Sequence, residues 1–243
     1  MSKLGLIMRN PKRELEWAYF KHLCRKENRD ITEMFYDITL FKPNGKIEDK
    51  IHGRAESLVR NAFNFIAQNM LQICPNVEGH GGYGVGSLKI KDTAAALSTT
   101  WYTHYNADLE SESYGFRALA SNATFGILLD GSAAAYDFEA IAPTTKIGTG
   151  NAVGYINYGD TLLPQLSYNA GTAIWTCLWD RSFTNNSGGD ITVNALCLAG
   201  AVTDYSQTRS ANMMFARDVL PAPFTFTDGR TAIARYTLTH EAA

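Results

Sequence analysis

The hydrophobic positions of the C-terminal part fall in short runs separated by turn-forming residues, a pattern typical of β-sheet proteins. Residues 191–199, 224–227 and 231–239 are apolar or alternate between apolar and polar positions. The Asn-Asn-Ser-Gly-Gly run at 185–189 can supply the left-handed backbone of a tight connection. Asp228-Gly229 is a strong short turn signal. The stretch therefore predicts several strands joined by tight turns.

Pro221 and Pro223 interrupt this pattern, and because proline lacks a backbone N–H they fit a sheet edge or a crossover and not a central strand. The same texture begins at Trp101. Turns containing Gly, Asn or Asp separate further short apolar runs at 125–129, 152–158, 174–179 and 213–220. Only residues 134–141 resemble a short helix. We expect a mainly β protein whose body is a jelly-roll-like β-sandwich.

The N-terminal part predicts a helix over about 11–27. Asn10 can cap it and Pro11 suits its first position. One face of this helix gathers the apolar residues Leu15, Ala18, Tyr19 and Leu23. A β-hairpin is predicted next, with strands at 34–41 and 46–52 around a Pro-Asn-Gly turn.

Residues 55–73 form the clearest helical pattern, with apolar residues at helical spacing until Pro75. So wide a stripe must be buried, either against the preceding hairpin or against a second subunit, and the sequence leaves both open. For the second case the candidate interface residues are Leu58, Val59, Ala62, Phe63, Ile66 and Met70. With the Gly-rich run at 79–86, this divides the chain into an α+β docking region (1–76), a Gly/Ala/Ser/Thr-rich linker (77–100) and the sandwich (101–243).

The composition agrees with a β protein that has a weakly charged surface: 45% of the 243 residues are hydrophobic, 19% are charged and the net charge is -2. Residues 1–60 hold 13 Lys/Arg and 9 Asp/Glu (+4), and the remainder holds 9 and 15 (-6). This imbalance is too weak to indicate nucleic-acid binding. No apolar run approaches the ~20 residues that span a bilayer, and the N-terminus lacks a secretory pattern, so we expect folding in a cytoplasm.

The four cysteines contain no C-x-x-C pair. Cys177 and Cys197 lie in strand-like runs, where a buried reduced thiol is the favoured interpretation, although a bridge between neighbouring strands stays open. Gly148–Gly154 resembles a dinucleotide loop only loosely and is better explained as a connection between strands. His80-Gly81-Gly82 has no nucleophile elbow to accompany it.

Two further sets of residues could bind ligands. His104 with Asp108, Glu110 and Glu112 could hold a hard cation, but a solvated acidic turn is the default for such a cluster. An aromatic group could stack on sugars if it is exposed, although strand aromatics are more often core. Its members are Trp101, Tyr102, Tyr105 and Tyr114. Neither set indicates a catalytic site, and no cofactor is expected.

A series of motifs over residues 120–240 resembles, in its order, the sequence of a known protein domain. The series contains an RSFTNNSGGDITV segment at 181–193, an ARDVL segment at 216–220 and the end RYTL at 235–238. They follow Phe125-Gly126-Ile127, Asp137-Phe138 and Asn157-Tyr158-Gly159. In this order they resemble a domain that recurs in structural proteins of tailed bacteriophages, where the first segment is a hairpin. The run from Asp37 to Met70 also resembles the strand–turn–strand–helix that often opens such proteins.

The resemblance implies a non-enzymatic virion component of the neck, collar, tail or capsid surface, assembled in the host cytoplasm. Its partners would be further copies of itself, in a ring or trimer, and neighbouring virion proteins, with neither nucleic acid nor membrane as a direct partner. A receptor- or carbohydrate-binding appendage is the alternative, and a polysaccharide-degrading enzyme is the weakest hypothesis. On this interpretation Arg217-Asp218, with a local ion pair or backbone contact, and residues 185–189 are scaffold.

Overall fold

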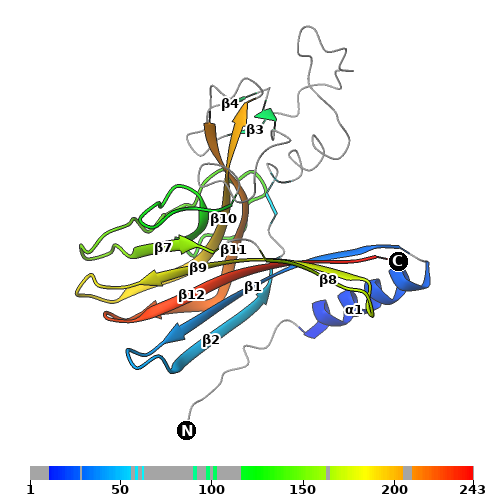
Figure 1. The fold of residues 1–243 in the computed structure, drawn as a ribbon, viewed down its shortest axis with the longest axis horizontal. Coiled ribbons are helices and arrows are strands. Elements are labelled where there is room, and N and C mark those ends of the chain that lie inside the picture. The colour runs from blue at the N-terminus through cyan, green and yellow to red at the C-terminus, as the bar shows by residue number, and fades with distance from the viewer. Residues whose placement is uncertain are drawn as a thin grey trace.

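The computed structural model describes residues 11–27, 29–55, 58–59, 62, 90–91, 97–98, 101–102, 116–162, 165–204 and 210–242. In these ranges the protein is mainly β, with antiparallel sheets and one α-helix, α1 (Pro11–Lys26) (Figure 1). The expected mainly β fold is therefore confirmed. So are the predicted N-terminal helix and the hairpin that follows it.

The first sheet has the order β2-β1-β12-β9-β7, and β8 pairs with the part of β9 that β7 leaves open. Its strands are β1 (Ile31–Phe41), β2 (Ile47–Arg54), β7 (Asn157–Thr161), β8 (Gln165–Asn169), β9 (Ile174–Thr184) and β12 (Thr231–Glu241). The N-terminal hairpin thus continues the sheet of the C-terminal strands, because β1 pairs with β12 along its whole length. The proposed domain limits stay a prediction.

The second sheet is built on β10, which pairs with β11 on one side and with β5 and β6 on the other. Its strands are β5 (Trp101–Tyr102), β6 (Gly126–Asp130), β10 (Ile191–Asp204) and β11 (Ser210–Phe226). The short strands β3 (Ile90–Lys91) and β4 (Leu97–Ser98) pair with each other. The predicted strands at 213–220 and 224–227 are one strand, β11, and its proline segment lies opposite a break in the register of β10, on the sheet edge.

One hydrophobic core joins the two sheets in a β-sandwich. Strand β1 alternates buried and less buried residues, and its buried side chains include Tyr36, Ile38 and Leu40. Strand β6 is buried at all five positions. Strand β10 lies along one edge of β6, and residues 145–147 lie along the other, where the Ile147 N–H donates to the Leu129 carbonyl and Lys146 forms a bridge with Asp130. Residues 131–147 contain no helix, so the helix suggested at 134–141 was wrong.

Both tight turns of the C-terminal stretch connect the two sheets and do not close hairpins. Residues 185–190 lead from β9 in the first sheet to β10 in the second, and residues 227–230 lead back from β11 to β12. Asn185, which is fully buried, joins the two turns: its side-chain amide donates to the carbonyls of Gly189 and Phe226, and its backbone pairs with Gly229 and Arg230. The hairpin expected at 181–193 is therefore wrong, although the turns were placed correctly.

Candidate functional site

The first sheet extends beyond the second at one end (Figure 1). There Ile31 pairs with Glu241, Glu241 with Ile174, and Ile174 with Asn169, so four strands form the projection. We call residues 31–35, 165–169, 174–178 and 237–241 the arm. Cross-strand partners share a face of a sheet, so the arm has two faces: one continues the face that lines the sandwich core, and the other faces the opposite way.

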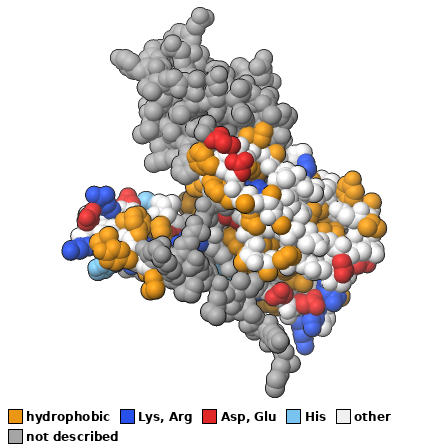
Figure 2. Space-filling view, turned by 180° about the vertical axis from the view of Figure 1, so that it is seen from behind, with side chains coloured by type: hydrophobic (Ala, Val, Ile, Leu, Met, Phe, Trp, Pro, Cys, Tyr) orange, Lys and Arg blue, Asp and Glu red, His pale blue; other side chains and the backbone are white. Residues whose placement is uncertain are grey.

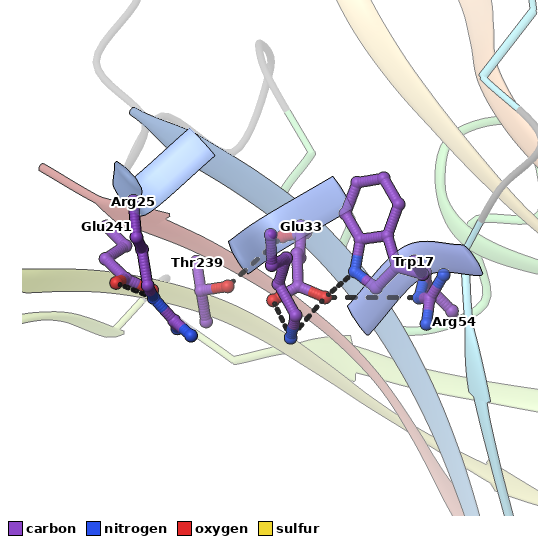
Figure 3. A network of polar contacts seen from close by, with 7 residues as sticks. Trp17, Arg25, Glu33, Arg54, Thr239 and Glu241 are labelled. Atoms are coloured by element: carbon purple, nitrogen blue, oxygen red, sulfur yellow. Dashed lines mark hydrogen bonds and ion pairs between the residues drawn. The ribbon is translucent and has the colours of Figure 1, made fainter. Parts of the chain in front are cut away.

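Helix α1 covers the second of these faces through a network centred on Glu33 (Figure 3). The indole N–H of Trp17 donates to Glu33 Oε1 over 2.7 Å, and Lys21 Nζ lies 3.2 Å from Glu33 Oε2. The Arg54 guanidinium lies over the Trp17 ring, 4.8 Å from its centroid, with its Nε 4.0 Å from Glu33. One carboxylate from the sheet therefore orients two side chains of the helix.

A second contact fixes the C-terminal end of α1. The Arg25 guanidinium donates two hydrogen bonds, of 2.7 and 2.8 Å, to the carboxylate of Glu241 at the end of β12. This bidentate pair lowers the pKa of Glu241, chiefly through the hydrogen bond, and raises the pKa of Arg25 for the same reason. Cys24 is buried on the same turn of the helix.

Three of the four residues in the apolar stripe predicted for α1 face solvent, and the fourth, Leu23, is partly buried. Leu15 and Tyr19 are 72% and 64% exposed, and Ala18 is exposed too. Trp17, Lys21 and Cys24 turn toward the sheet instead, because Glu33 and Glu241 offer partners to polar and cationic groups there. The sequence pattern thus predicted the position of the helix correctly, but it predicted the wrong face of the helix to be buried. The consequence is an exposed apolar strip along the outside of the helix.

The core-side face of the arm exposes three large apolar side chains on β8 and β9. Leu166 and Tyr168 of β8 are 67% and 49% exposed, and Trp175 of β9 is 44% exposed. Tyr168 and Trp175 are cross-strand partners with ring centroids 4.6 Å apart. Figure 2 shows hydrophobic side chains gathered on the arm and α1, which project at the left of that view. We call Leu166, Tyr168 and Trp175 the arm patch, and clustered exposed apolar groups of this kind mark interaction sites.

In the body of the protein away from the arm, by contrast, charged groups are buried with their partners. Arg217 Nε lies 2.8 Å from Asp130 Oδ2, and both side chains are buried. The guanidinium also donates to the carbonyls of Ser132 and Ala134, while Asp130 accepts backbone N–H groups, among them that of Thr144. The pair thereby ties residues 131–147 to the outer face of the second sheet.

The ion pair and backbone contacts expected for Arg217-Asp218 are present, but they are not local, because their partners are distant in the sequence. Successive residues of a strand point to opposite faces, so Arg217 points outward to Asp130 and Asp218 points into the sandwich. There Asp218 accepts a 2.8 Å hydrogen bond from the hydroxyl of Tyr236 in the opposite sheet. Burial, then the nearby Asp218 charge, raises the pKa of Tyr236, so the phenol stays protonated as a donor.

Arg181 is a second buried cation, and it is held by carbonyl groups. Its guanidinium donates to the carbonyls of Leu119, Asn122, Phe125, Ile127 and Gly159. Gly126 has φ +82, and a Cβ there would lie 3.1 Å from the guanidinium, so the turn into β6 requires glycine. Burial lowers the pKa of Arg181 to about 10. Four of its five donors join β9 to residues 119–127, and the fifth bonds to Gly159 of β7.

The candidate interface of the second predicted helix is only partly described. Val59 and Ala62 are buried within the chain: the Val59 N–H donates to the Phe215 carbonyl, and Ala62 joins a cluster with Met213 and Phe215. Leu58 forms a bridge with Ala216 of the same strand. These three residues pack on β11, and Val59 also belongs to the main core cluster, which includes Met34 and Ile51 of the preceding hairpin. Phe63, Ile66 and Met70 lie outside the described residues, as does most of 55–73.

The other candidate ligand residues are mostly outside the described ranges as well: Tyr105, Tyr114, His80, His104, Asp108, Glu110 and Glu112. Trp101 and Tyr102 form β5 and pair with Asp204 and Thr203. Among the described residues no group of three metal-ligating side chains lies together. Residues 148–154 form a loop before β7, as predicted, with Gly150 and Gly154 at positive φ.

Cys177 and Cys197 are free thiols in different sheets, so the reduced interpretation is confirmed and the bridge is excluded. Burial raises the pKa of both thiols, which keeps them protonated. Cys24 is also free and buried.

Comparisons with protein-family models, curated proteins and solved structures give no match. In the part of the chain that the structure describes, no helix is long and apolar enough to cross a membrane.

Proposed function

We propose that this protein is a non-enzymatic structural component of a tailed-phage particle, which self-associates and docks on neighbouring neck, collar, tail or capsid proteins. The observation that carries the proposal is the arm. A sheet end with Leu166, Tyr168 and Trp175 on one face, and an α1 with exposed Leu15 on the other, suits contact with another protein surface. The motif order over residues 120–240 supplies the phage assignment.

The buried polar groups support a scaffold role. Arg217, Asp130 and Arg181 are engaged by fixed partners that join separate segments. Each carboxylate oxygen of Asp130 already accepts two hydrogen bonds from Arg217 or from backbone N–H groups, so neither oxygen is open to a substrate. These groups are best explained as fold-specifying contacts.

The decisive experiment combines sedimentation of the full chain with its location in the particle. We expect association at micromolar concentration and density for the chain at defined, symmetry-related positions in a map of the intact virion. A chain that stays monomeric at high concentration and binds no virion protein would contradict the proposal. A particle map without this chain would contradict it equally.

A receptor- or carbohydrate-binding appendage is the second candidate, and the exposed Tyr168–Trp175 pair favours it because aromatic faces stack on sugar rings. A glycan array with the full chain tests this candidate. Glycan binding that is lost in one of two variants would support it. Loss in Trp175→Ala would place the glycan site on the arm, and loss in Trp101→Ala would place it at β5 of the second sheet. Uniform absence of glycan binding, together with self-association, would favour the assembly role.

A further inference from the structure

We propose that β8 is a self-pairing edge: two copies of this chain join β8 to β8 antiparallel, centred on Ser167, and continue the first sheet across a two-fold axis. This inference rests on the self-association in the proposed function, and it adds the strand, the register and the symmetry of the contact. The inference starts from the difference between the edge of β8 and the other sheet edges, which are protected against pairing.

The other edges of the first sheet carry features that discourage pairing. Strand β2 presents Glu48, Asp49 and Lys50, and its pairing with β1 contains a register shift. Strand β7 is covered: the Ser121 N–H donates to the Tyr158 carbonyl, and other backbone bonds join it to the same segment. Both edges are therefore closed to a further strand.

In the second sheet, the edge strand β11 is closed in two other ways. Pro221 and Pro223 remove backbone donors there, and Leu58 and Val59 lie along the strand by a bridge and a backbone hydrogen bond. Natural sheets commonly protect their edges by such means, since an open edge templates pairing with another chain. Closure is thus the rule for these three edges.

Strand β8 lacks all these features. Its sequence, Gln-Leu-Ser-Tyr-Asn, has no charge and no proline, its register with β9 is regular, and every residue is exposed. Among the described strands it pairs with β9 alone. An open, uncharged edge beside an apolar face is suited to pairing with a strand of another chain.

The direction of the backbone groups fixes which residues would bond. The Asp180 carbonyl accepts the Leu162 N–H on the side of β9 that β8 also occupies. Backbone groups alternate in direction along a strand, so Thr176 bonds on that same side, to its partner Ser167. The neighbours of Ser167 in β8 therefore direct their N–H and C=O groups to the open edge.

Those neighbours are Leu166 and Tyr168, and their hydrogen bonds determine the register in which β8 pairs with β8 of a second copy. Centring the two-fold on Ser167 pairs Leu166 of each copy with Tyr168 of the other, so all four open residues exchange hydrogen bonds. Gln165 then lies opposite Asn169, amide against amide. Shifting the centre by one residue leaves part of the strand unpaired, so this register uses the edge fully.

A second copy suits this edge better than an unrelated partner because the strand is complementary to itself. In this register no charge meets a like charge, apolar residues meet apolar residues, and the two arm patches join on one side of the continuous sheet. Each copy contributes three large exposed side chains, so the buried area falls at the low end of specific interfaces, roughly 1,000 Å². We therefore expect a dimer of micromolar affinity.

The first test is sedimentation of the full chain over a concentration series. We expect a monomer–dimer equilibrium, weakened at least tenfold in Leu166→Lys and in Tyr168→Lys, because each variant places a charge at the new contact. Val153→Lys, at an exposed apolar residue of a distant loop, is the matched control and should leave association unchanged. Thermal unfolding of each variant confirms that the fold is retained.

The second test uses a cysteine at the two-fold centre. Ser167 would face its own copy as a non-hydrogen-bonded pair, whose Cα atoms lie about 4.5 Å apart, within disulfide range. Ser167→Cys should therefore form a covalent dimer under mild oxidation. Gln165→Cys, which would face Asn169, is the control for random crosslinking and for the native cysteines.

The outcomes separate this inference from the proposed function. Association without the Ser167→Cys crosslink, or association insensitive to both lysine variants, overturns β8 pairing and leaves an assembly role in place. A trimer or ring without a two-fold axis does the same. A monomeric chain that binds no virion protein overturns both.

Discussion

The first sheet of the sandwich and the arm are made of the same strands with the same alternation of side chains. Side chains on the core-side face are buried in the sandwich, whereas large apolar ones are exposed in the arm. Trp179 and Trp175 lie four residues apart on one face of β9. Trp179 is buried and packs edge-on against Phe116, with ring centroids 5.4 Å apart, whereas Trp175 is half exposed. The difference lies in what faces the strand, because the second sheet ends before the arm begins (Figure 1).

Polar groups follow the same division. In the sandwich, Arg181, Arg217 and Asp130 are buried and are bonded to groups far away in the sequence. In the arm, Glu33 and Glu241 form exposed or partly exposed contacts with the single helix. Substitutions should therefore change stability strongly in the sandwich and association mainly in the arm.

The largest effect is expected for Arg181. Arg181→Ala would leave five carbonyls without a donor and open a cavity, and a loss of about 4–5 kcal/mol of unfolding free energy follows. Arg181→Lys should lose nearly as much, because one ammonium group cannot reach carbonyls on all sides. Urea unfolding measures both variants. A loss below about 1 kcal/mol would contradict the scaffold role.

Removal of Asp130 should cost about 3–5 kcal/mol, because Asp130→Ala leaves the Arg217 charge buried without its carboxylate. The double variant Asp130→Ala/Arg217→Met should recover part of this loss, since no buried charge remains. A double-mutant cycle from denaturant unfolding gives the coupling energy. Additive losses would show that the two residues act independently.

The two tryptophans give the most direct comparison of the regions. Trp179→Ala should destabilise the protein by about 3–5 kcal/mol, whereas Trp175→Ala should change the unfolding free energy by less than about 1 kcal/mol. Trp175→Ala should instead weaken self-association in sedimentation. Equal destabilisation by both substitutions would mean that the arm face is covered within one chain.

The smallest effect is expected at the contact between α1 and the arm, and it depends on pH. The pKa of Glu241 is lowered in the folded protein, so its contribution is complete above the ordinary carboxyl pKa and is lost as the pH falls through the lowered value. The protection factors of the α1 amides, which correct hydrogen exchange for the pH dependence of the intrinsic rate, should therefore fall in acid. In Glu241→Gln the protection factors should already be low at neutral pH and change less with acidification.

Much of the fold could be predicted because its causes are local. Turn residues, prolines and the alternation of apolar positions located most strands and the connections at 185–189 and 228–229. They could not show which strands pair. An Asn-Gly or Asp-Gly turn between apolar runs suits a hairpin and a crossover alike, so the pairing of β9 with β12 required the tertiary structure.

The candidate site was missed for a related reason. Leu166, Tyr168 and Trp175 have the pattern of ordinary strand residues, and only the end of the second sheet leaves them exposed. Likewise, Leu15 and Tyr19 form the more apolar side of α1, yet the carboxylates of Glu33 and Glu241 draw the opposite side to the sheet. A sequence pattern cannot report which surface a distant segment covers.

The β class, the N-terminal helix and hairpin, and the positions of the tight turns follow from the amino-acid sequence, because dihedral preference and apolar periodicity act over a few residues. The tertiary structure alone decided that the hairpin continues the C-terminal sheet, that Arg217 pairs with Asp130, and that one sheet extends past the other. Those features join residues far apart in the chain. They arise from the packing of two sheets of unequal extent.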